Sequence, residues 1–126
     1  MKFQFAYRNP ENFEENLLEF KKQLESKDFS NMFFQIYSEV LEPEKISEVC
    51  LGIEGVFPEA MYIGCSTSGN IIDCQLSAEI TVVCTAFEYS STQFQIYQYD
   101  LSRESVDSIT GQIVEETKKN PWVKAI

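Results

Sequence analysis

Apolar and polar side chains alternate at the start of the chain and then recur at helical spacing. Phe3, Phe5 and Tyr7 alternate with Gln4 and Ala6, which predicts a half-buried strand over residues 2–7. The dipeptide Asn9-Pro10 is typical of a helix start, with Asn9 as the N-cap. The apolar positions that follow predict a helix ending near residue 27, whose buried face carries Phe13, Leu17, Phe20 and Leu24.

Two segments that are apolar on both faces predict interior strands of a sheet. Residues 31–39 and 78–89 are both rich in strand-forming side chains. Between them, Pro43 begins a second predicted helix, which Gly55 and Pro58 end. Its buried face is expected to carry Ile46, Val49, Cys50 and Ile53.

The remaining segments predict short strands and a last helix. Residues 60–66 indicate a strand, and residues 70–74 a brief return to extended structure. Alternation over 92–99 predicts a hairpin partner for the preceding strand. Ser102 is the expected cap of a final helix that stops at Asn120-Pro121, with Val106, Ile109 and Ile113 as its buried stripe.

This order of elements favours an α/β fold with mixed α+β character. We expect a mixed β-sheet with about three helices packed on it, in a single domain over residues 1–126. The closing residues 121–126 resemble the start of another strand, so the chain is expected to be part of a longer protein. An unfinished sheet edge would also favour self-association, and a homodimer is one expected partner state.

Charge and residue content exclude several classes of function. The net charge of −10 disfavours binding to nucleic acid or to an anionic membrane surface. The sequence contains no histidine, which removes histidine-based triads, Cys-His dyads and a histidine haem ligand. We therefore expect no catalytic residues, no metal site and no cofactor. The chain shows no signal peptide and no apolar run long enough to span a membrane, so a cytoplasmic location is expected.

The segment MYIGCSTSGNI, residues 61–71, gathers small polar side chains between two glycines at the end of a predicted strand. Backbone N–H groups and hydroxyls in such a loop can bind an anionic group, and glycine lets a ligand approach the backbone closely. The candidate ligand-binding residues are Gly64, Cys65, Ser66, Thr67, Ser68, Gly69 and Asn70. The alternative is a structural turn whose hydroxyls satisfy nearby backbone groups. Tyr97 and Tyr99 could line a pocket or pack under a helix.

The same segment resembles the N-terminal part of the FIST domain. An apolar strand followed by G-C-[ST]-T-x-G-[EN]-I is typical of that family, and Gly64 to Thr67 and Gly69 to Ile71 stand at those positions. The resemblance implies a cytoplasmic, bacterial sensory module that binds a small molecule such as an amino acid or organic acid. It also implies a fused signalling output domain, such as a GGDEF diguanylate cyclase.

Three functions remain open at this point. The first is a non-catalytic sensory domain that regulates a fused output domain in response to a small ligand. The second is a dimerisation or interaction module in which the glycine loop is purely structural. The third, an enzyme that uses Cys65 as a nucleophile, lacks a visible partner to activate the thiol.

Overall fold

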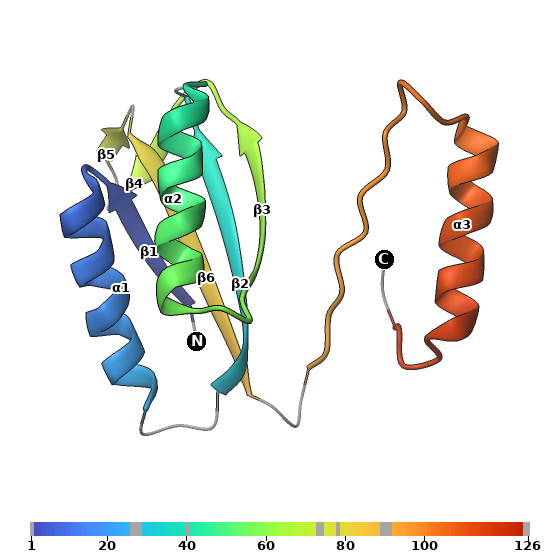
Figure 1. Cartoon of the computed structure of the whole chain (residues 1–126), viewed down its shortest axis with the longest axis horizontal. Coiled ribbons are helices and arrows are strands. Elements are labelled where there is room, and N and C mark those ends of the chain that lie inside the picture. The colour runs from blue at the N-terminus through green and yellow to red at the C-terminus, as the bar shows by residue number, and fades with distance from the viewer. Residues whose placement is uncertain are drawn as a thin grey trace. The chain divides into compact units, whose positions relative to one another are not determined.

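The computed structural model describes residues 2–25, 29–39, 41–72, 75–77, 79–88 and 92–124. The chain divides into two compact units, and Figure 1 shows the elements of each. The first unit comprises residues 1–93 and contains the sheet with two helices. The second unit comprises residues 94–126 and contains one helix.

A four-stranded mixed sheet forms the first unit, in the order β1-β6-β2-β3. Its strands are β1 (Lys2–Tyr7), β2 (Phe29–Ser38), β3 (Met61–Ser66) and β6 (Ile80–Glu88). Strand β6 is antiparallel to both β1 and β2, whereas β2 and β3 are parallel. The two strands predicted as interior, β2 and β6, occupy the two central positions. The mixed sheet and the three helices of the chain confirm the predicted fold class.

Helices α1 (Pro10–Leu24) and α2 (Pro43–Val56) cover one face of this sheet (Figure 1). The side chain of Asn9 accepts a hydrogen bond of 2.9 Å from the Asn12 backbone, as the predicted N-cap requires. Every residue predicted for the buried face of α1 is buried, and Val49 and Ile53 of α2 are fully buried. The core between helices and sheet is aromatic, with Phe20 near both Phe3 and Phe57.

A small hairpin of β4 (Asn70–Ile72) and β5 (Gln75–Ser77) forms a separate two-stranded sheet. Strand β4 agrees with the extended segment predicted to begin at residue 70. Asp73 and Cys74, which close that prediction, lie outside the described residues. Strand β5 was not predicted, because three residues are too few for a periodic pattern.

The predicted hairpin strand over residues 92–99 is wrong, since these residues form no strand. Strand β6 pairs with β1 along one edge and with β2 along the other. It therefore has no free edge to which the next segment could add, although that segment does alternate in sequence.

Helix α3 (Val106–Lys119) begins later than predicted. The backbone and hydroxyl of Ser102 both donate to the Asp100 carboxylate, and Ser105 is the N-cap instead. Of the predicted buried stripe only Ile109 is buried, and Val106 is 68% exposed. The helix stops at Asn120 as predicted.

Residues beyond α3 turn instead of starting the strand expected at 121–126. The Val123 backbone donates to the Asn120 carbonyl at 3.0 Å, which closes the turn. Ala125 and Ile126 lie outside the described residues.

Candidate functional site

The parallel pairing of β2 and β3 places their carboxyl ends side by side, with Ser38 opposite Ser66. The backbone of Thr67 donates a hydrogen bond of 2.9 Å to the Ser38 carbonyl, so the ladder continues one residue past β3. The loop predicted as a ligand site therefore leaves the sheet at an edge formed by strand ends. Ligands of α/β proteins commonly bind at such an edge.

Asn70 closes this loop from within. Its side chain is buried, and its amide nitrogen donates to the Tyr37 carbonyl at 3.3 Å and to the Glu79 carbonyl at 2.9 Å. Its amide oxygen accepts a hydrogen bond of 2.9 Å from the Thr67 hydroxyl. Asn70 thus links the loop to the end of β2 and to the start of β6. Two of the seven candidate residues have their polar side chains engaged inside the protein.

The first three candidate residues lie in β3 itself and are exposed: Gly64, Cys65 and Ser66. Close packing against β2 explains why residue 64 is a glycine. A Cβ there would lie 3.2 Å from the Ile36 carbonyl oxygen. Any larger residue would press on the backbone of the neighbouring strand.

Ser68 and Gly69 form the tip of the loop. Ser68 is exposed, and Gly69 has a φ of +140°, a conformation that disfavours residues with a side chain. Within the described chain, no hydrogen bond engages the backbone N–H or the hydroxyl of Ser68, nor the N–H of Gly69. These donors are free to meet a ligand.

Two acidic residues adjoin the ends of strands at the same side of the sheet. Glu39 directly follows β2, and Glu79 directly precedes β6, where its carbonyl accepts the Asn70 amide. The Arg8 guanidinium lies 3.8 Å from the Glu79 carboxylate, with both side chains largely in solvent.

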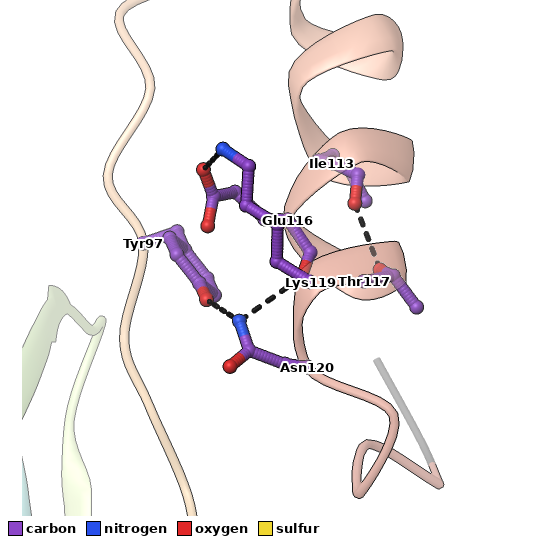
Figure 2. Close-up of polar contacts among 6 residues, drawn as sticks. All are labelled: Tyr97, Ile113, Glu116, Thr117, Lys119 and Asn120. Atoms are coloured by element: carbon purple, nitrogen blue, oxygen red, sulfur yellow. Dashed lines mark hydrogen bonds and ion pairs between the residues drawn. The ribbon is translucent and has the colours of Figure 1, made fainter.

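A hollow lies within the second unit, between residues 97–99 and α3. It is open to solvent, has a volume of about 650 Å³, and is lined by both Tyr97 and Tyr99. Figure 2 shows that the polar groups there bond to one another: the Asn120 amide donates to the Tyr97 hydroxyl, and Lys119 pairs with Glu116. The two tyrosines thus line a hollow, and the Tyr97 hydroxyl, Glu116 and Lys119 in its lining are engaged in bonds within the second unit.

A comparison with family models decides what kind of domain this is. The model of the FIST N domain matches residues 32–123, which is well over half of the chain. The chain belongs to the FIST N domain family. No curated protein and no solved structure matches it. The family consists of signal-transduction sensory domains and is not a catalytic one.

Two tyrosine–carboxylate hydrogen bonds join α2 to strands β1 and β3 in this FIST N domain. The sequence patterns do not predict them. Tyr7 of β1 donates to Glu48, and Tyr62 of β3 donates to Glu54. Burial, followed by the bond to Glu48, raises the pKa of Tyr7 to about 12. The bond to Glu54, followed by burial, raises the pKa of Tyr62 to about 12. The alternation of β1 predicted the inward direction of Tyr7, but not its partner on a helix 41 positions away.

The described part of this FIST N domain shows neither a metal-binding cluster nor a membrane-spanning helix. Among those residues, no three His, Cys, Asp or Glu side chains come together in a way that could hold a metal ion. The same residues include no helix with the length and apolar character needed to cross a membrane.

Proposed function

We propose that this FIST N domain senses a small zwitterionic metabolite, of the amino-acid class, and regulates a fused output domain such as a diguanylate cyclase. The observation that carries the proposal is the loop tip at the strand ends, where the donors of Ser68 and Gly69 are unused by the described chain. Family membership supplies the sensory role, and the loop supplies a place for the ligand.

The chemistry of the edge favours a zwitterion over a plain anion. A ligand carboxylate would accept hydrogen bonds from the loop N–H groups and from the Ser66 and Ser68 hydroxyls, as anions do in backbone nests. A ligand ammonium group would be attracted to the carboxylates of Glu39 and Glu79, which lie at the same edge. The same two carboxylates would repel a dicarboxylic acid that lacks an amine.

Asn70 offers a route for the signal. Its amide joins the loop to the carbonyls of Tyr37 and Glu79, at the ends of both interior strands. A ligand that pulled Ser68 and Gly69 outward would strain the Thr67–Asn70 hydrogen bond and shift those strand ends. Binding could then change the sheet without any large movement of the helices.

A dimerisation or interaction module with a purely structural loop is the second candidate. The internal bonds of Thr67 and Asn70 favour it, since they are what a structural turn requires. The free donors at the loop tip distinguish the two functions, because a purely structural turn does not need them to bind anything.

A thermal-shift screen of the purified chain against amino acids and organic acids tests the proposal. We expect at least one amino acid to raise the melting temperature in proportion to the logarithm of its concentration. Ser68→Ala should reduce that shift, whereas Thr110→Ala, which removes a hydroxyl from α3, should leave it unchanged. If no compound stabilises the chain, or if both variants respond like the native protein, the loop is not the ligand site.

A further inference from the structure

The outer edge of β3 pairs with no other strand among the described residues of the first unit. Strand β3 pairs with β2 along its inner edge. Because Thr67 N–H points to β2, alternation along the strand directs the backbone groups of Tyr62, Gly64 and Ser66 outward. These donors and acceptors match the spacing of another strand, and an extended peptide satisfies them best.

This edge lacks the features that usually prevent pairing. Residues 60–69 include no charged side chain and no proline, although the chain carries a net charge of −10. Lysine, proline or inward charge would be expected on a strand meant to stay solvated. The opposite edge strand, β1, begins at Lys2 and is followed by Arg8. The neutral β3 edge is therefore where two acidic copies could meet with little repulsion.

We infer that the partner is a second copy of this chain, joined through antiparallel pairing of β3 with β3 about a two-fold axis at Gly64. In this register Gly64 pairs with itself, and Tyr62 lies opposite Ser66 of the other copy. Ile63 lies opposite Cys65 in the same way. Each contact sets a large side chain against a small one, and the axis falls where no Cβ is present. The two sheets then form one continuous sheet with the helices on one face.

The inference does not depend on ligand binding at the loop. It uses only the backbone direction of β3, its neutrality and the size pattern of its side chains. A failure of the amino-acid screen would leave it standing, and a monomeric protein would leave the screen standing.

Disulfide trapping tests both the pairing and its register. Directly opposite residues in a pair without hydrogen bonds are about 4.5 Å apart at Cα, within the range of a disulfide. In a background with Cys50→Ser and Cys74→Ser, we expect Ile63→Cys to give a covalent dimer on oxidation with copper phenanthroline. The background chain, which keeps Cys65 and the buried Cys84, and the Ile63→Cys, Cys65→Ser chain should remain monomeric on a non-reducing gel.

The controls also decide between neighbouring registers. Cross-linking of the background chain would place Cys65 opposite itself, and cross-linking of Ile63→Cys, Cys65→Ser would place residue 63 opposite itself. Either result, or the absence of any covalent dimer, would overturn the proposed register.

Sedimentation equilibrium tests the association without oxidation. Ile63 is 44% exposed, so Ile63→Lys can keep the fold while placing a charge next to the axis of pairing. We expect it to weaken dimerisation at least tenfold, whereas Leu76→Lys, at a residue 85% exposed on β5, should not. Ser66→Pro, which removes an outward N–H and no bond to β2, should act like Ile63→Lys. A native chain that stays monomeric at millimolar concentration contradicts the inference.

Discussion

The Thr67 hydroxyl donates a hydrogen bond of 2.9 Å to the side-chain oxygen of Asn70 across the turn of the glycine loop. The Asn70 amide in turn donates to carbonyls at the ends of β2 and just before β6. The loop therefore has an inner half that stabilises the fold and a tip, Ser68 and Gly69, that remains available. This division separates the effects of loop substitutions on stability from their effects on binding.

Asn70 should be among the most sensitive loop positions for stability. Asn70→Ala removes the amide that bonds to the Tyr37 carbonyl, the Glu79 carbonyl and the Thr67 hydroxyl, an expected loss of about 0.5–1.5 kcal/mol for each hydrogen bond. Asn70→Asp should be worse, because it sets a carboxylate against two carbonyl oxygens. Urea unfolding followed by circular dichroism measures both, and native stability of Asn70→Asp would contradict this role.

Thr67 should contribute less than Asn70 but measurably. Thr67→Ala removes one hydrogen bond, an expected loss of about 0.5–1.5 kcal/mol in the free energy of unfolding. Thr67→Ser keeps the hydroxyl and is the matched control, with most of that loss restored. An equal loss in both variants would mean that the methyl group, and not the hydrogen bond, supports the turn.

Gly69 should resist substitution because of its backbone and not because of crowding. A Cβ there would meet no atom within 4 Å, but its φ of +140° is one that residues with side chains rarely adopt. We expect Gly69→Ala to lower the free energy of unfolding by about 1–3 kcal/mol. Gly55→Ala, in α2 with similar open space, should be neutral or slightly stabilising. Equal effects at the two positions would argue against strain at residue 69.

Alkaline pH should destabilise the first unit. The pKa of Tyr7 is raised to about 12, chiefly by burial, and burial also raises the pKa of the Cys84 thiol to about 12. The folded state holds these protons more tightly than the unfolded state, whose groups titrate near their ordinary values of about 10 and about 8.5. The stabilisation is therefore complete below about pH 8.5 and is lost as pH rises toward 12.

Chemical denaturation between pH 8 and pH 11 measures this loss. Tyr7→Phe cannot ionise, so its free energy of unfolding should fall less steeply with pH than that of the native chain. Parallel curves for the two proteins would show that Tyr7 does not cause the alkaline instability.

Local signals in the sequence predicted the local structure well. Asn9-Pro10 marked the start of α1 because a cap acts over one turn of chain. The apolar character of both faces marked β2 and β6 as interior strands, since only a central strand buries both. The strand predicted over 92–99 is wrong because strand pairing depends on which edges are free, and both edges of β6 are occupied.

Competition between similar residues explains the displaced start of α3. Ser102 and Ser105 are equally good caps by type, but Asp100 takes the hydrogen bonds of Ser102. Ser105 is left to accept from the Ser108 backbone at 3.2 Å. Such a choice depends on side-chain geometry that residue type does not encode.

The sequence predicted where the glycine loop lies, but not which of its residues stabilise the fold and which form the available tip. The partners of Asn70 lie 33 and 9 positions away, so its burial follows from the assembled sheet and not from the loop pattern. The positive φ of Gly69 was foreseeable from residue type, because glycine is the residue that accepts it readily.

The most direct test of the sensory account is to map ligand contacts on the backbone amides. The ¹⁵N-labelled chain would be titrated with the amino acid that stabilises it most, and shifts followed in ¹H–¹⁵N correlation spectra. The account predicts the largest saturable shifts at Ser66, Ser68 and Gly69, with smaller ones at Tyr37 and Ile80. Shifts that cluster at Tyr97, Gly111 and Gln112, or the absence of saturable shifts, would contradict a ligand site at the glycine loop.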